Sequence, residues 1–166
     1  MMSEAGRGQE KGPEVLFYEL QRETLETALV PLLEKSLARG WKAVVRAGSA
    51  ERVAALDAHL WTYRPDSFLP HGTSADGHTD RQPVFLTHGN DNPANAEVLF
   101  LVDGATPEAW DDTSLNALAR VVLLFDGANE AARAAARSQW TSVRKAGLAA
   151  TYWKQSEFGR WEKQGG

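Results

Sequence analysis

The chain has 166 residues, which is enough for one domain whose core needs no cross-links. It contains no cysteine, which excludes disulfides, thiolate metal sites and cysteine nucleophiles and fits the reducing cytoplasm, where we expect the protein to reside. With 18 Lys and Arg against 22 Asp and Glu, the net charge is −4. A protein that binds nucleic acid on its own usually carries a basic surplus, so we expect direct DNA contact to be weak or absent.

Six short runs rich in β-branched, leucine and aromatic residues have the composition of strands. In chain order they are Glu14–Leu20, Trp41–Ala47, Pro83–Thr87, Glu97–Val102, Arg120–Phe125 and Ala149–Trp153. The run that starts at Glu97 is continuously apolar after its first residue, which predicts burial on both faces of a sheet.

Helix signals fall between these strands. The predicted helices run from Thr24 to Gly40, from Ser49 to about Trp61 and from Asn129 to about Ala146, with shorter turns at Thr106–Trp110 and Thr113–Leu118. Each long helix begins at a residue whose side chain can cap it: Thr24, Ser49 and Asn129. Pro31 lies inside the first pattern, where it should kink the helix or weaken one turn.

Strands that alternate with helices predict an α/β fold, a three-layer α/β/α sandwich around a largely parallel sheet with Rossmann-like topology. We expect a disordered N-terminal tail at 1–12, a single domain at 13–155 and a polar C-terminal tail at 156–166 with Phe158 and Trp161 as a docking turn. The segment 71–82 is polar and glycine-rich, and we expect it to be mobile. No apolar run approaches the roughly 20 residues of a membrane span, and because the first residues include no apolar stretch, we expect no signal peptide there.

The segment Leu60–Gly72 is a loop with unusual apolar content. Its two prolines, Pro65 and Pro70, remove backbone donors and exclude helix around them. The large apolar side chains either fold back beneath the loop or form a patch for a partner, and the sequence leaves both interpretations open.

Catalytic motifs are missing. Gly48 and Ser49 follow a strand and open a helix, where a phosphate can sit, but they lack the dinucleotide-binding and Walker spacings, so no nucleotide-binding fingerprint is present. The four histidines (His59, His71, His78 and His88) show no metal-binding spacing, and we expect no metal or other cofactor. Asp103 and Asp126 each follow a buried strand, where turn chemistry is the simpler account and a ligand site the alternative.

The last long helix carries a basic stripe. On a helical wheel Arg133, Arg137, Trp140 and Arg144 fall within an arc of about 60°. A second group, expected to approach the sheet, contains mainly small residues: Ala132, Ala135, Ala136, Gln139 and Val143. The stripe is either a solvated charged face over a packed indole or an anion site, because guanidiniums bind carboxylates bidentately and stack on aromatic rings.

Several of these segments together resemble one family. The proline-rich loop contributes Trp61, Pro65, Ser67, Phe68, Leu69, Pro70 and His71, and Asn92–Asn95, Ala146–Gly147 and Thr151–Trp153 contribute further matches. In combination, across residues 14–154, they are similar to the chi subunit of bacterial DNA polymerase III. The resemblance implies a non-catalytic accessory subunit that bridges the clamp loader to single-stranded DNA-binding protein.

The resemblance also implies two partner sites. Arg133, Arg137 and Trp140 match positions that hold the acidic C-terminal tail of single-stranded DNA-binding protein, whereas Thr141 stands where a further basic residue is expected and Arg144 or Lys145 could compensate. The tail's terminal carboxylate would pair with an arginine, and its last aromatic residue would enter an apolar pocket near Trp140. The second site, which would join the psi subunit or another partner such as a helicase, comprises Trp61, Phe68, Leu69 and Pro70.

The alternative from another class is a nucleotide- or small-molecule-binding α/β enzyme. It would use the helix start at Gly48 and Ser49 together with Asp103 or Asp126.

Overall fold

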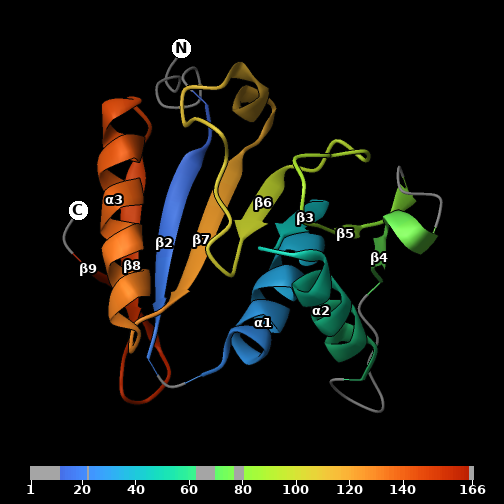
Figure 1. Ribbon diagram of the computed structural model, residues 1–166, viewed down its shortest axis with the longest axis horizontal. Helices are drawn as coiled ribbons and strands as arrows, with labels where there is room; N and C mark the ends of the chain where they lie inside the picture. The colour runs from blue at the N-terminus through green and yellow to red at the C-terminus, as the bar shows by residue number, and fades with distance from the viewer. Residues whose placement is uncertain (1–11, 22, 63–69, 77–80, 165–166) are drawn as a thin grey trace.

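The computed structural model describes residues 12–21, 23–62, 70–76 and 81–164, apart from the side chains of Trp61 and Thr62 (Figure 1). Within this part of the chain, eight strands form one sheet in the order β4-β5-β3-β6-β7-β2-β8-β9. The strands are β2 Glu14–Leu20, β3 Ala43–Arg46, β4 Gly72–Thr73, β5 Val84–Thr87, β6 Val98–Leu101, β7 Arg120–Asp126, β8 Ala150–Gln155 and β9 Trp161–Gln164. All neighbouring strands are parallel except β8 and β9, which confirms the predicted largely parallel sheet of an α/β fold.

The helices are α1 Leu25–Ala38, α2 Ala50–Thr62 and α3 Glu130–Lys145, with short 3-10 turns at Ser74–Asp76 and Thr113–Ala117. Thr24 and Asn129 are the predicted N-caps of α1 and α3. The helix α1 is continuous through Pro31, and Gly40 just beyond its end has a φ of 84°, a left-handed conformation that glycine adopts without strain.

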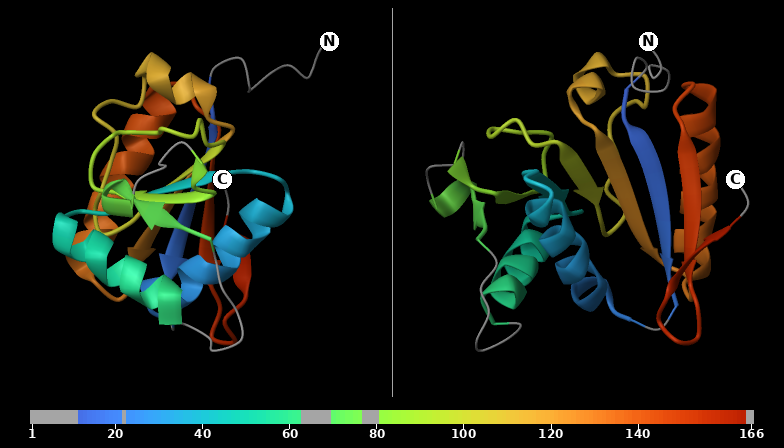
Figure 2. Two further views of the ribbon diagram at one scale, coloured as in Figure 1. Left: turned by 90° about the vertical axis from the view of Figure 1, so that its right-hand side faces the viewer. Right: turned by 180° about the vertical axis from the view of Figure 1, so that it is seen from behind.

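Two apolar clusters lie on opposite faces of the sheet. Along β2, Leu16 and Leu20 join the cluster beneath α1 and α2, whereas Val15 and Phe17 join the cluster beneath α3. This alternation follows from the two-residue period of a strand. Helices therefore cover both faces, and Figure 2 shows α3 set apart from α1 and α2.

The centre of the sheet is apolar throughout. Every residue of β6 is buried, as its continuous apolar run predicts, and five of the seven residues in β7 are buried. The two strands pair in parallel with each other and with their other neighbours, β3 and β2. This core fixes the carboxyl ends of the strands, where the chain turns into α1 and α3.

Several local predictions were wrong. The expected C-terminal tail at 156–166 includes β9, which pairs antiparallel with β8 and places Trp161 against Tyr18, with ring centroids 4.7 Å apart. In the expected docking turn, Phe158 is 84% exposed, so only Trp161 packs. Thr106–Trp110 forms no helical turn, and Asp112 rather than Thr113 caps the turn that follows. The expected tail at 1–12 lies outside the described residues, apart from Gly12.

The segment 71–82, expected to be mobile, begins with ordered structure. Gly72 and Thr73 form β4, which pairs in parallel with β5. Asp76 accepts a hydrogen bond from the backbone N–H of Thr73 at 2.8 Å and thereby closes the turn. Residues 77–80 lie outside the described part.

Candidate functional site on helix α3

The start and end of α3 follow from local sequence signals. The Asn129 side chain accepts a hydrogen bond from the Ala132 N–H at 2.9 Å, which satisfies one of the free donors at the helix start. Glu130 lies in the first turn, and Arg144 and Lys145 lie in the last, where their charges complement the helix dipole. The C-cap is Ala146, close to the predicted end of the helix.

The helix packs on the sheet through small side chains. Ala136 and Val143 are buried, and Ala132 is half-buried. Ala135, predicted to approach the sheet with them, is exposed instead, because it lies at the edge of that group and faces a cavity rather than a strand. Small residues let the helix axis come close to β7 and β8, so the longer side chains stand along its margin.

Three arginines lie exposed on α3 beside a half-buried indole. We call the set Arg133, Arg137, Trp140 and Arg144 the arginine face, and the structure brings them together on one helix as the wheel predicts. Among the described residues, no ion pair to a carboxylate is found for any of the three guanidiniums. Their hydrogen-bonding groups are therefore available to an anionic partner.

Trp140 is fixed by the core rather than free in solvent. Its ring meets Phe17 edge to face, with centroids 5.3 Å apart, and Tyr152 at 6.1 Å. The Arg144 guanidinium lies 5.8 Å from the centre of the Trp140 ring, within range of a cation–π contact. The indole thus forms a rigid apolar base beside Arg144, as the packed-indole interpretation predicts, whereas the anion site stays a prediction.

A buried carboxylate lies beside this face, and no local sequence pattern indicated it. Glu19 of β2 is 6% exposed and accepts hydrogen bonds from the Tyr152 hydroxyl and the Gln21 side chain. Burial first, and then the bond to Glu19, raise the pKa of Tyr152, whereas the charges of Arg137 and Arg133 act in the opposite direction. The two arginines therefore lie close enough to Tyr152 for their fields to act on its hydroxyl.

The second predicted surface is described only in part. Trp61 lies in the last turn of α2 with its side chain outside the described residues, and Phe68 and Leu69 lie outside them entirely. Pro70 is exposed. The next residue, His71, has a fully buried side chain whose Nε2 lies 3.0 Å from Oδ1 of Asp57 on α2, which corrects its expected place in a mobile segment. This pair attaches the end of the proline-rich loop to α2.

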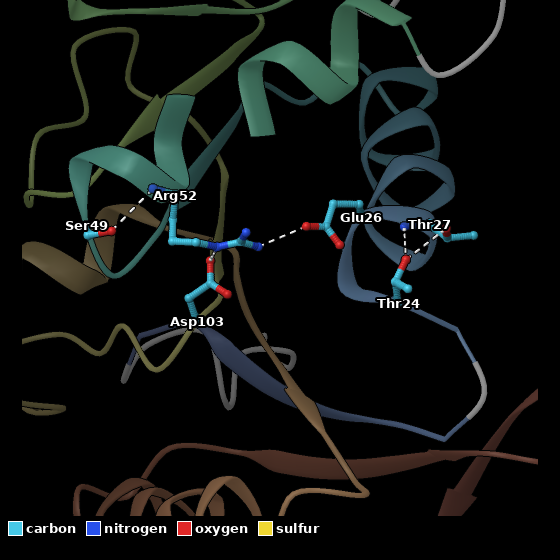
Figure 3. Close-up of polar contacts among 6 residues, drawn as sticks. All are labelled: Thr24, Glu26, Thr27, Ser49, Arg52 and Asp103. Atoms are coloured by element: carbon cyan, nitrogen blue, oxygen red, sulfur yellow. Dashed lines mark hydrogen bonds and ion pairs between the residues drawn. The ribbon is translucent and has the colours of Figure 1, made fainter. Parts of the chain in front are cut away.

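The start of α2 is occupied by contacts of its own (Figure 3). Ser49 caps the helix by accepting the Arg52 N–H at 3.2 Å. The Arg52 side chain pairs with Glu26 and Asp103, both at 2.9 Å. A Cβ on Gly48 would lie 2.7 Å from the Asp103 carbonyl oxygen, so close packing explains this glycine. With a carboxylate and a carbonyl at this helix start, the predicted phosphate position is unfavourable for an anion.

This ion-pair cluster also sets the protonation of Glu26. Partial burial is the largest single influence and tends to raise its pKa. The hydrogen bond from Arg52, a backbone hydrogen bond and the charges of Arg52 and His59 act in the opposite direction, and together they lower the pKa of Glu26. Of the other sequence candidates, Asp126 accepts a hydrogen bond from the Ala128 N–H at 2.9 Å, as the turn interpretation predicts.

No group of three or more metal-ligating side chains occurs within the described ranges. None of the helices in that part of the chain has the length and apolar character needed to cross a bilayer.

Together, the fold and the site define an α/β protein with a cationic helix face that suits an anionic partner. A family model described as the DNA polymerase III chi subunit, HolC, matches residues 13–151. The chain belongs to this family of DNA polymerase III subunits, which confirms the resemblance and links the protein to DNA replication.

One relative supports the same assignment. The protein named probable DNA polymerase III subunit chi from Rickettsia prowazekii (strain Madrid E) is 32% identical over 85 residues, which are 51% of this chain and 52% of the relative. The match therefore spans about half the length of that protein.

Proposed function

We propose that this protein is a non-catalytic accessory subunit of the DNA polymerase III holoenzyme that holds the acidic C-terminal tail of single-stranded DNA-binding protein on its arginine face. The observation that supports this most directly is the set of three exposed guanidiniums on α3, none of them paired with a described carboxylate, around the half-buried Trp140. Membership of the chi subunit family makes a replication partner the natural source of the anion.

The chemistry of the two partners is complementary. A guanidinium binds a carboxylate through two parallel hydrogen bonds, so the terminal carboxylate and acidic side chains of the tail can each find a donor pair. The Trp140 ring, fixed against Phe17 and Tyr152, offers an apolar edge to the aromatic residue that ends the tail. Thr141 supplies no charge and bonds to the Arg137 carbonyl at 3.2 Å, so we expect Arg144 to provide the third cation.

A second contact would join the protein to the clamp loader. We assign it to the residues that the family resemblance indicates, Trp61, Phe68, Leu69 and Pro70, with the psi subunit or another clamp-loader component as partner. The pair formed by the buried His71 and the partly exposed Asp57 supports this assignment because it attaches one end of the loop to α2. A helicase that uses the same patch is the alternative partner.

Two such contacts on one rigid body give a bridge. Each contact can be modest, because linking the two raises the effective concentration of the polymerase assembly at template coated with single-stranded DNA-binding protein. The polymerase chemistry would then belong to another subunit, and this chain would need no cofactor and no strong DNA contact of its own.

The enzyme alternative has less support. It required an open helix start at Gly48 and Ser49, but Arg52, Glu26 and Asp103 surround that position. A nucleotide phosphate would meet the Asp103 carboxylate there.

The test is a titration of a labelled peptide that copies the acidic tail, followed by fluorescence anisotropy at low and moderate salt. We expect roughly micromolar binding that weakens with salt. Arg137→Ala should cost about 1–3 kcal/mol of binding free energy through loss of a charge-assisted contact. The matched control is Lys35→Ala, which removes one positive charge from an exposed position of α1 on the opposite face of the sheet. This variant should bind the peptide as the wild type does. Equal binding by Arg137→Ala and the wild type would remove the arginine face from the site.

A further inference from the structure

A cavity of about 680 Å³ opens at the carboxyl ends of the central strands. Its walls include Leu20 at the end of β2, Phe125 at the end of β7 and Leu101 at the end of β6. The first residues of α1 and the alanine side of α3 close it from two sides. Its volume lies in the range of small-molecule sites.

The cavity lies at the point where the strand connections change direction. After β2 the chain passes through α1 to β3, toward the β4 edge, whereas after β7 it passes through α3 to β8, toward the β9 edge. Figure 1 shows these neighbouring strands leading to helices on opposite sides. In open α/β sheets the crevice at such a switch point is where ligands bind, because the two connections diverge and leave space between them. We call this space the switch-point cavity.

The lining is apolar at depth and acidic at the rim. Leu20, Leu101 and Leu123 are buried side chains at its base, and Ala135 on α3 is exposed to it. The rim carries three carboxylates, Glu23, Asp103 and Asp126, and the described lining includes no lysine, arginine or histidine.

The neighbouring groups that the structure describes do not neutralise this rim. Asp103 shares Arg52 with Glu26, so these three side chains keep one negative charge. Glu23 accepts a hydrogen bond from the neutral Gln155 amide, and Asp126 from the Ala128 N–H. Among the described groups, the three rim carboxylates and Glu26 carry four negative charges, and Arg52 carries one positive charge. Three negative charges therefore remain at the mouth of an apolar space.

We propose that the switch-point cavity is a second binding site, which takes an organic cation: a primary amine or guanidinium carried on an apolar ring or chain. The apolar body enters between the strand ends and the alanines of α3, and the charged group remains at the rim beside Asp126 and Glu23. The amine belongs either to a free small molecule or to a basic side chain of a partner peptide, since both present the same chemistry. The site does not depend on the arginine face, so either proposal can fail alone.

The same charges exclude other occupants. A nucleotide would bring its phosphates to a rim of carboxylates without a cation in the described lining, and an acidic peptide would meet the same repulsion. The cavity therefore discriminates against the ligand proposed for the arginine face.

The test uses three probes with one aromatic body and different charges: tryptamine (cation), 3-methylindole (neutral) and indole-3-acetate (anion). Amide NMR spectra of the full chain are recorded during each titration, with adenosine monophosphate as the nucleotide probe. We expect tryptamine to shift the amides of Gly104, Ala105 and Ala135 in a saturable way, 3-methylindole to do so more weakly, and the two anions to leave them unchanged. A blocked Leu-Lys dipeptide amide tests the side-chain source, and stronger binding of this peptide than of tryptamine would assign the site to a partner protein.

Two variants separate cavity binding from surface adsorption. Ala135→Phe fills the cavity from an exposed helix position and should abolish the shifts, whereas Ala134→Phe, at the adjacent exposed position outside the lining, should not. Asp126→Asn keeps an acceptor for the Ala128 N–H and should weaken tryptamine about two- to fivefold, the range for a solvent-accessible charge pair. Equal binding of tryptamine and indole-3-acetate, or no shift at these amides with any cation, would overturn the proposal.

Discussion

The two sides of α3 differ in charge and in shape. On the arginine face, three exposed cationic side chains accompany an indole that packs against the core. On the other side, alanines line a cavity whose rim is acidic. One helix thus separates a surface suited to an acidic peptide from a space that repels it. The net charge of −4 argues against a polyanion as partner for the whole protein, but it says little about the charge of a single face.

The largest effect should follow from reversing the charge of the arginine face. In the double variant Arg133→Glu/Arg137→Glu, the acidic tail meets carboxylates on the former arginine face as well as at the rim of the switch-point cavity. We expect its affinity to fall by about 100-fold or more, because like-charge contacts cost several kcal/mol. Anisotropy titration measures the loss, and thermal unfolding checks that the fold is kept, because both side chains are exposed. Lys35→Glu on α1 is the control, and a comparable loss there would show that only overall charge matters.

Trp140→Ala should affect stability as well as binding. The ring packs against Phe17 and Tyr152, so its removal leaves a gap at the edge of the core, and we expect a loss of about 2–3 kcal/mol in the free energy of unfolding, less than for a fully buried Trp. Urea denaturation measures this cost. Trp140→Phe should recover most of it. A Trp140→Ala protein as stable as the wild type would mean that the ring rests on the surface and does not fix the arginine face.

Much of the fold could be predicted from the sequence. The features that could not be predicted depend on contacts between residues far apart in the chain. The boundaries of β2 and the Asn129 cap of α3 were predicted correctly because their signals are local. The strand β9 was missed because its polar sequence becomes a strand only when Trp161 meets Tyr18. Burial of His71 likewise depends on Asp57, fourteen positions earlier in the chain.

The candidate sites show the same division. The arginine face repeats at helical spacing within one element, so the sequence could place its members together. Asp103 and Asp126 were each predicted at a strand end, but a shared cavity could not be predicted because the sequence does not give the order of β6, β7 and β2. The second partner site stays a prediction, since Phe68 and Leu69 lie outside the described residues.

A smaller effect, in the opposite direction, is expected at Thr141. This exposed side chain contacts only the Arg137 carbonyl among the described residues. Thr141→Arg adds a cation to the arginine face, and we expect the acidic tail to bind about two- to fivefold more tightly, as for one solvent-accessible charge pair. Ala38→Arg adds the same charge at the end of α1. If both variants gain equally, the improvement comes from long-range attraction and not from a contact.

The smallest effect concerns alkaline pH. Because burial and Glu19 raise the pKa of Tyr152, the folded state holds the phenolic proton more tightly than the unfolded chain does. The resulting stability is complete below a pH of about 10, the ordinary value for tyrosine, and is lost as the pH rises toward the folded-state pKa. Urea denaturation across this range should therefore show a steeper decline for the wild type than for Tyr152→Phe. Parallel declines would mean that Tyr152 titrates normally in the folded protein.

An amide NMR titration of the whole chain with the acidic tail peptide shows whether α3 separates a surface for an acidic peptide from a cavity that repels one. We predict saturable shifts along Arg133, Arg137 and Arg144 and at Tyr152, with Gly104 and Ala105 at the switch-point cavity unchanged. Shifts at the cavity without shifts along the arginine face would show that the cavity, and not the arginine face, takes the acidic peptide. The absence of any shift at low salt would remove the acidic tail as a ligand of this protein.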